Sequence, residues 1–314
     1  MKPELQAVLQ RNIAVRRQIL TRLSHEQRMR LLGLLFRDCF VDLGAMLLKW
    51  AALTGQSAQI DTGYVAQHVA SIVLSEPGQG FRGKGLDLAD GGEVKSAANI
   101  SGVDRPRWNH NLGKPADDAA RRAKGEDPVW QTYLDAPVVF YLLFDRVVSS
   151  DITVQPEVRV RAWCLNPSED SAWTSLVRRF VAERKPSQYN LQLHPPVGYD
   201  DDIVVNTLGS LDFADIKVFE ARISQIDSPH PVITWTQPPA NSVIPIGGRS
   251  RALPYAKDRP SRLVAADDVL ADMSQIALLV PDMDLADLSA AVAAEQAVSA
   301  TVFEQGTNED EAES

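Results

Sequence analysis

The spacing of the apolar residues changes at Pro77, and this change constrains the fold more than any other feature of the chain. Before Pro77 the apolar residues recur every three to four positions, which is typical of amphipathic helices. We expect two helices within the first 55 residues, the second beginning at a capping box formed by Ser24 and Gln27, and a third helix over residues 62–74. After Pro77 short apolar runs alternate with turn residues, which is typical of strands. The order of these segments predicts an α/β (α+β) fold, with a mixed β-sheet core flanked by helices.

The segments after Pro77 predict the parts of the sheet. Residues 138–144 are almost all apolar, so we expect a central strand, whereas residues 158–163 alternate as in a half-exposed strand. The polar, basic connector at residues 105–124 predicts a loop or a broken helix. We expect a helix at residues 173–181 and strands at residues 190–194 and 216–223. The chain then divides into an N-terminal helical region (1–60), a core (61–264), and an Ala-rich helical segment with a disordered acidic end (265–314).

Charge is distributed unevenly along the chain. Residues 265–314 contain twelve Asp and Glu residues and no Lys or Arg, so the net charge of −9 for the whole chain leaves +3 for residues 1–264. A mildly basic body is compatible with a nucleic-acid partner, although this value alone does not indicate one. The acidic end is a candidate competitor of DNA for a basic groove.

Composition excludes several classes of protein. The chain has 45% hydrophobic residues, enough for a buried core, but no run of about 18 apolar residues that would span a membrane. Its first residues lack the layout of a signal peptide, so we expect a cytoplasmic protein. Cys39 and Cys164 lie far apart without a CxxC motif, which argues against a disulfide framework or a structural zinc site.

Glu93 and Lys95 carry the strongest chemical signal in the chain. In a strand, side chains two positions apart leave the same face, so both can meet one ligand. The preceding Asp-Gly-Gly segment predicts a three-residue hairpin loop with Gly92 in the left-handed conformation. This loop pairs Asp87 with Lys95, whereas a two-residue loop would turn Asp87 to the other face. We therefore expect Asp87, Glu93 and Lys95 to converge at the end of a hairpin.

Two carboxylates and an amine form a site for a hard divalent cation. Mg²⁺ prefers oxygen ligands and keeps several waters, so its ligands would be Asp87, Glu93, the backbone carbonyl of Val94 and a phosphate oxygen. The cation would neutralise charge that develops on a phosphate and acidify a bound water, while Lys95 would orient or deprotonate that water. Glu76, at the end of the third predicted helix, is a further candidate metal ligand, with a plain helix-terminal charge as the alternative. Two carboxylates, an amine and a divalent cation together suit phosphodiester hydrolysis.

Short ExK patterns arise by chance, and two related patterns occur elsewhere in the chain. The ExK at residues 183–185 closes a predicted helix and lacks a local upstream Asp, so we interpret it as solvent-exposed. Asp215 and Lys217 form a DxK pattern with acidic residues upstream at 200–202 and 212, but without a tight hairpin. An incidental charge pair on a surface strand is the alternative interpretation both of this pattern and of the hairpin.

The connector and the strand at residues 190–194 carry side chains that suit DNA. Arg and Lys bind phosphates, while Asn, Gln and Arg make paired hydrogen bonds with base edges. A well-capped turn and a structural edge strand are the alternative interpretations of the two segments. The candidate DNA-binding residues are Arg105, Arg107, Trp108, Asn109, His110, Asn111 and Lys114 in the connector, and Asn190, Gln192 and His194 in the strand.

The pattern Asp87-x5-Glu93-x-Lys95 is similar to the signature of the PD-(D/E)xK nucleases. Together with the segments at residues 85–96, 105–111 and 191–196, it resembles type II restriction endonucleases, most closely the MamI-type family. The sequence departs from the signature at Leu86, which stands where the superfamily has a proline.

The resemblance implies a restriction-endonuclease-like fold and a Mg²⁺-dependent homodimer that cuts both strands of a palindromic DNA site, leaving 5′-phosphates. It also implies a bacterial enzyme with a cognate methyltransferase that protects host DNA. On this basis Asp87 and Glu93 would hold the metal, and Lys95 would act on water. The residues alone leave two alternatives open: a mismatch-repair-like nicking endonuclease, and a non-catalytic nucleic-acid-binding module.

Overall fold

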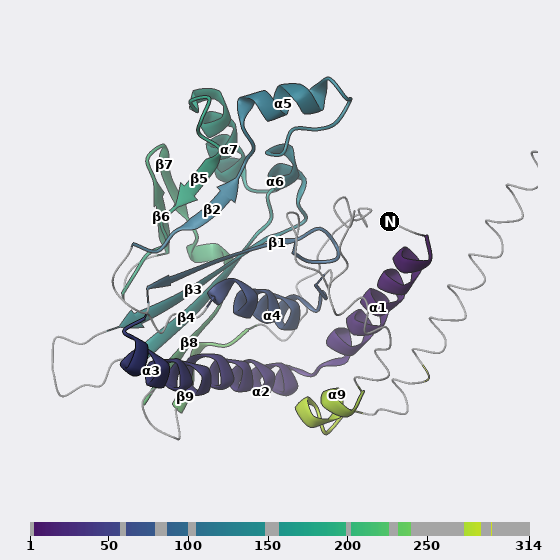
Figure 1. Cartoon of the computed structure of the whole chain (residues 1–314), viewed down its shortest axis with the longest axis vertical. Coiled ribbons are helices and arrows are strands. Elements are labelled where there is room, and N and C mark those ends of the chain that lie inside the picture. Colours follow the sequence, from purple (N-terminus) through teal and green to yellow (C-terminus); the bar gives the residue numbers. More distant parts are fainter. Residues whose placement is uncertain are drawn as a thin grey trace, which may run out of the picture.

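A five-stranded sheet lies at the centre of the protein, in the order β1-β3-β4-β8-β9 (Figure 1). The computed structural model describes residues 3–56, 61–78, 87–99, 105–147, 157–198, 202–225, 232–239, 273–283 and 290. β1 runs parallel to β3, and the other neighbouring strands are antiparallel. The mixed sheet predicted from the sequence is therefore confirmed. Its strands are β1 (Glu93–Asn99), β3 (Val139–Val147), β4 (Glu157–Leu165), β8 (Lys217–Ser224) and β9 (Val232–Gln237).

Helices from the N-terminal part of the chain lie on one side of this sheet (Figure 1). The capping box predicted at Ser24 is present: Ser24 Oγ accepts from the N–H of Gln27 at 3.1 Å, and Gln27 Oε1 accepts from the N–H of Ser24 at 2.8 Å. Gly55 ends the helix at Leu43–Thr54 in the left-handed conformation, with φ +69°. The helices are α1 (Pro3–Arg22), α2 (His25–Phe36), a π-helical turn (Arg37–Asp42), α3 (Leu43–Thr54) and α4 (Thr62–Leu74).

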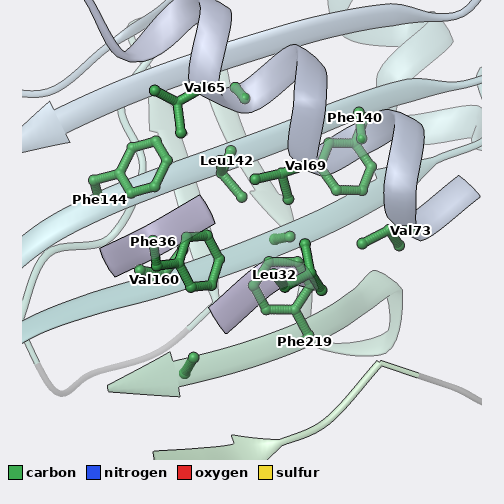
Figure 2. Close-up of a cluster of buried hydrophobic side chains, with 14 of the residues drawn as sticks. Leu32, Phe36, Val65, Val69, Val73, Phe140, Leu142, Phe144, Val160 and Phe219 are labelled. Atoms are coloured by element: carbon green, nitrogen blue, oxygen red, sulfur yellow. The ribbon is translucent and has the colours of Figure 1, made fainter. Parts of the chain in front are cut away.

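α2 and α4 pack onto the sheet through one hydrophobic core (Figure 2). The residues at positions 139–144 of β3 are buried on both of its faces, which confirms the central strand predicted there. On the helical side, side chains spaced three to four residues apart meet alternate residues of the strand. The core contains Leu32 and Phe36 of α2, Val65, Val69 and Val73 of α4, and Phe140, Leu142 and Phe144 of β3.

A second layer covers the opposite face of the sheet (Figure 1). It contains two small antiparallel sheets, β2 with β5 and β6 with β7. Trp108 and Trp173 anchor the layer in a second core that includes Tyr141 and Trp163 of the central sheet. The elements of this layer are β2 (Trp108–Asn111), α5 (Pro115–Arg122), α6 (Gln131–Asp135), α7 (Ser171–Glu183), β5 (Asn190–Leu193), β6 (Ile203–Asn206), β7 (Gly209–Asp212) and a 3₁₀-helix (Ala214–Ile216).

Two local predictions were wrong. The connector was predicted as a loop or a broken helix: residues 115–122 are helical, in α5, but residues 108–111 form a strand. Trp108 and His110 are buried in the second layer while Asn109 and Asn111 are exposed, as in a half-buried strand. β4 is not half-exposed, because its Arg side chains are buried against acidic partners. Arg159 pairs with Glu220 through two contacts of 2.8 Å. An alternating charge pattern therefore marks a buried ionic pair here, not a solvent-facing edge.

The C-terminal part of the chain is described only in short pieces. α9 (Met273–Leu279) is helical, and Val280 after it packs against Leu23 and Leu31 near α2. The remainder of the helical segment predicted at 265–303, and the acidic end at 304–314, lie outside the described residues. In the described segments, no helix is long and apolar enough to cross a membrane.

Candidate active site

β1 carries Glu93 and Lys95 at the edge of the central sheet. The N–H of Glu93 donates to the carbonyl of Val138 at 3.0 Å, and the strand continues in parallel register with β3. Glu93 is buried, and the Lys95 ammonium forms an ion pair with Glu93 Oε1. The predicted placement of both side chains on one face of a strand is therefore confirmed.

The predicted hairpin before β1 was wrong. Leu88 makes an isolated antiparallel bridge with Gly78, and the ladder partner of β1 is β3. The turn is closed by Gly91, whose φ is +101° and whose N–H donates to the carbonyl of Leu88 at 3.1 Å. Gly92 has a different requirement: a Cβ atom there would lie 2.8 Å from Val138 and 2.9 Å from Leu88. Close packing, and not a left-handed conformation, explains the glycine at position 92.

Asp87 nevertheless lies beside β1, as expected. Its Oδ2 accepts the backbone N–H of Val94 at 2.9 Å, and its Oδ1 accepts a hydrogen bond from Gln67 Nε2 at 2.6 Å. Gln67 belongs to α4, so the helix layer helps to fix the carboxylate. No pattern in the sequence indicated Gln67, because its role depends on how α4 packs against the strand.

Burial dominates the electrostatics of the two carboxylates, and pairing dominates that of Lys95. It raises the pKa of Glu93 to about 7, against the opposing effect of the Lys95 ammonium. Burial also raises the pKa of Asp87, although the hydrogen bond from Val94 and the charge of Lys95 act against the shift. For Lys95, the pairing with Glu93 outweighs burial and raises the pKa above its usual value. Lys95 therefore stays charged, while the two buried carboxylates would be stabilised by a further cation.

The donor atoms at this edge fit a hard cation such as Mg²⁺. Because the N–H and C=O of one strand residue point to the same side, the Val94 carbonyl faces the edge at which its N–H meets Asp87. Within the described segments, no group of three Asp, Glu, His or Cys residues could hold a metal by itself. Mg²⁺ tolerates a partial protein shell, since it keeps waters and takes phosphate oxygens. Asp87, Glu93 and the Val94 carbonyl are suitable ligands on this basis.

Glu76 is engaged elsewhere. It is buried and forms an ion pair with Arg17, whose Nε lies 2.8 Å from Glu76 Oε2. Its charge acts on Asp90, whose pKa is raised to about 6 chiefly by burial and further by Glu76. We therefore leave Glu76 out of the proposed metal site.

Tyr133 of α6 adjoins the acid–base pair and was not anticipated. Its hydroxyl donates to Glu93 Oε1 at 3.5 Å, and its ring lies 5.7 Å from the Lys95 ammonium nitrogen. The edge of the His110 ring packs on Tyr133 at a centroid distance of 5.5 Å. These contacts form an aromatic wall on the side of the site that faces the second layer.

His110 is a structural residue in this arrangement. Its Nδ1 lies 3.3 Å from the carbonyl of Leu191, so Nδ1 carries the proton and Nε2 accepts from the hydroxyl of Tyr141 at 2.9 Å. Burial lowers its pKa well below the usual value, and the charge of Lys95 lowers it further. His110 is therefore neutral, and both of its ring nitrogens are hydrogen-bonded.

Two of the predicted DNA-binding residues cannot contact DNA in this structure. Trp108 and His110 have no exposed surface because they point from β2 into the second core. Their assignment to DNA binding was wrong, since strand alternation turns them away from solvent.

The other candidates in these two strands come together on one outer surface. β2 and β5 pair in antiparallel register, with Asn109 opposite Gln192 and Asn111 opposite Asn190. Residues directly opposite each other share a face, so four amide side chains form one patch on what we call the β2–β5 ribbon. Asn109, Asn111 and Asn190 are exposed, and Gln192 is half-buried. The sequence indicated DNA-binding residues in both segments, but it did not predict that the two strands pair.

The remaining DNA-binding candidates flank this ribbon. Arg105, Arg107 and Lys114 are exposed in the connector, and Lys114 Nζ lies 5.4 Å from the centroid of the Tyr189 ring. His194, at the end of β5, is half-buried and lies with Nδ1 3.2 Å from the carbonyl of Pro106. Arg105, Arg107 and Lys114 thus provide positive charge around the amide patch.

The rival DxK pattern lacks the features of the β1 site. Lys217 Nζ lies 3.0 Å from Asp202 Oδ2 and 3.5 Å from Glu220 Oε2. Glu220 also pairs with Arg159, so cations already neutralise the acidic groups at this site. Asp215 is exposed in the 3₁₀-helix. Glu183, of the other ExK pattern, is exposed and pairs with Arg179 on α7, as expected.

Comparison with known proteins assigns the region of the chain that contains this site to one protein family. Residues 49–227 match the family model of the MamI restriction endonucleases. The chain belongs to this family. The type II restriction enzyme MamI of Microbacterium ammoniaphilum is 53% identical to it over 283 residues, covering 90% of this chain and 91% of that relative. No solved structure matches the chain. The region of the MamI family match includes β1, Tyr133 and the β2–β5 ribbon.

Proposed function

We propose that this MamI family member is a Mg²⁺-dependent type II restriction endonuclease, which hydrolyses phosphodiester bonds in both strands of double-stranded DNA and leaves 5′-phosphates. One observation carries the proposal: Asp87, Glu93 and Lys95 converge at an edge of the sheet, within a family of restriction endonucleases. Two buried carboxylates beside a charged amine are the groups that metal-assisted phosphodiester hydrolysis requires.

Asp87, Glu93 and the Val94 carbonyl would hold the metal. Bound there, Mg²⁺ supplies a Lewis acid for the phosphate oxygens and a water of lowered pKa. Gln67 and the Val94 amide keep the Asp87 carboxylate in place through the two hydrogen bonds described above. Lys95, charged and paired with Glu93, orients the attacking water or stabilises the negative charge that develops on the phosphate.

The β2–β5 ribbon would read the DNA sequence. Asn and Gln side chains suit the donor and acceptor pair on adenine edges, and the amides of Asn109, Asn111, Asn190 and Gln192 lie together on the outer face of the ribbon. The flanking charges of Arg105, Arg107 and Lys114, together with the His194 ring, would bind phosphates and set the register of the protein on the duplex.

The biological setting follows from the same proposal. A palindromic DNA site has two-fold symmetry, which a homodimer with one active site per copy would match. A methyltransferase of the same specificity would protect host DNA, and both enzymes would act in the bacterial cytoplasm, where that DNA is.

Cleavage of unmethylated phage DNA tests the proposal. We expect the wild-type protein with Mg²⁺ to give discrete fragments, and the Glu93→Ala and Lys95→Ala variants to give none. Asp215→Ala is the control and should cleave as the wild type does. A smear of fragments would indicate a non-specific nuclease, and nicked circles from supercoiled plasmid would indicate a nicking enzyme. Absence of cleavage with every divalent cation would favour a non-catalytic DNA-binding module.

A further inference from the structure

α3 is a helix of apolar composition with no buried residue among its twelve. α2 and α4, which precede and follow it, both bury apolar side chains against the sheet. Lys49 is the one charged residue within α3. Its exposed large side chains include Met46 at 56%, Trp50 at 60% and Leu53 at 77% of their full surface. An apolar helix left open in this way is a candidate contact surface.

The exposed side chains of α3 form a stripe, which we define as Leu43, Met46, Trp50 and Leu53. Their spacing of three, four and three residues is that of the seam between two packed helices. The order of these intervals is the same whether it is counted from the N-terminal or the C-terminal end of the helix. In an antiparallel pair of identical helices, Leu43 would therefore face Leu53 of the second copy, and Met46 would face Trp50. A two-fold axis generates this arrangement, and an unrelated partner would not require it.

The size of the stripe suits a dimer. Large apolar side chains present on the order of 200 Å² each, so the stripe exposes roughly 500 Å² per copy. Two copies would bury about 1,000 Å² in total, which is the lower limit for a specific interface. The exposed charged residues just before and within the helix, Arg37, Asp38, Asp42 and Lys49, carry no net charge, so they provide no attraction to an anionic membrane.

We propose that α3 is the dimer interface of this protein, packed antiparallel against α3 of a second copy. This inference rests on the proposed function in one respect, since cutting both strands at a palindromic site calls for two active sites. α3 and the β2–β5 ribbon lie on opposite sides of the central sheet (Figure 1), so the pairing leaves the ribbon free for DNA.

Sedimentation of the full chain tests the interface. We expect a dimer for the wild type and a monomer for Met46→Glu and for Trp50→Glu at the same concentration, because each variant places a carboxylate in an apolar seam. Leu48→Glu is the matched control: Leu48 is 58% exposed on the same helix but lies outside the stripe, so this variant should remain dimeric. Unchanged circular dichroism in all three variants would show that the fold is intact.

A double variant tests the antiparallel register. Met46→Glu combined with Trp50→Lys places opposite charges across an antiparallel pair and like charges across a parallel pair, so we expect it to recover dimer that Met46→Glu alone loses. A monomeric wild type, a dimeric Trp50→Glu variant, or a Leu48→Glu variant as monomeric as the others would overturn the inference. The readout is independent of catalysis: a dimer that cleaves no DNA would contradict the proposed function and leave the interface standing.

Discussion

Gln67 is the residue through which the helix layer reaches the proposed metal site. Its amide donates to Asp87 Oδ1 at 2.6 Å, while the other oxygen of Asp87 is held by the backbone of β1. A carboxylate held at both oxygens keeps one orientation, and this restraint reduces the entropy lost when it binds a cation.

We predict that Gln67→Ala weakens cleavage about 10- to 100-fold at limiting Mg²⁺, because removing a hydrogen bond to a metal ligand has effects of this size. Cleavage rates measured across a Mg²⁺ titration would check this. Excess Mg²⁺ should restore the Gln67→Ala variant but not Asp87→Ala, which lacks the ligand itself. Equal loss of activity at every Mg²⁺ concentration would contradict a role in positioning the ligand.

Tyr133 offers a second prediction at the scale of single residues. Tyr133→Phe keeps the ring beside Lys95 and against His110, and loses the hydroxyl that lies 3.5 Å from Glu93 Oε1. We expect it to cost about 1 kcal/mol of stability or less and to cleave within a few-fold of the wild type. Tyr133→Leu also removes the cation–π and aromatic contacts, and should lose about 2 kcal/mol or more.

Urea unfolding and single-turnover cleavage would separate these contributions. Equal losses in Tyr133→Phe and Tyr133→Leu would mean that the hydroxyl, and not the ring, is the important group.

At the scale of elements, the β2–β5 ribbon has two faces with different tasks. Its inner face carries Trp108 and His110, which are buried against the central sheet and the wall of the active site. Its outer face carries the amide patch. The strand period of two therefore connects the proposed DNA-reading surface to the proposed catalytic site through a single layer of side chains.

We predict opposite effects from neighbouring substitutions in β2. Asn109→Ala should weaken binding to the cognate DNA site by about 1–3 kcal/mol, with stability nearly unchanged, because the side chain is exposed. His110→Ala should lower stability by about 2 kcal/mol or more, because it leaves the Tyr141 hydroxyl without its partner and opens a cavity.

Binding in Ca²⁺, compared between cognate and random duplexes, together with urea unfolding, would check both effects. A large loss of stability in Asn109→Ala would contradict the assignment of Asn109 to the exposed outer face of the β2–β5 ribbon.

At the scale of the whole molecule, charge is segregated along the chain. Residues 304–314 carry five acidic groups, so their removal changes the formal net charge from −9 to −4. Non-specific DNA binding is governed by such charges and falls steeply with salt.

We predict that deletion of residues 304–314 strengthens binding to random duplex DNA at low salt, and that the difference disappears at high salt, where screening is strong. The measurement is binding affinity as a function of salt concentration for the full-length and the shortened chains. A shortened chain with unchanged affinity at low salt would exclude competition between this segment and DNA.

Local signals in the sequence determined the helices and part of the site. The Ser24 capping box, Gly55 and the 3.6-residue period each act between near neighbours in the chain, so α4 and one helix between Ser24 and Gly55 could be predicted from them. The π-helical turn that divides this helix into α2 and α3 was not predicted. The two-residue spacing of Glu93 and Lys95 likewise placed both side chains on one face of a strand.

The tertiary structure alone decided how the strands pair and which charges are buried. β1 pairs with β3, more than forty residues away, and Gln67 of α4 holds Asp87. Arg159 lies inside because Glu220 on another strand neutralises it. These features depend on contacts between residues far apart in the chain, and neither residue type nor spacing specifies such a partner. The sequence therefore indicated the chemistry of the site, while the packing of distant segments determined its geometry.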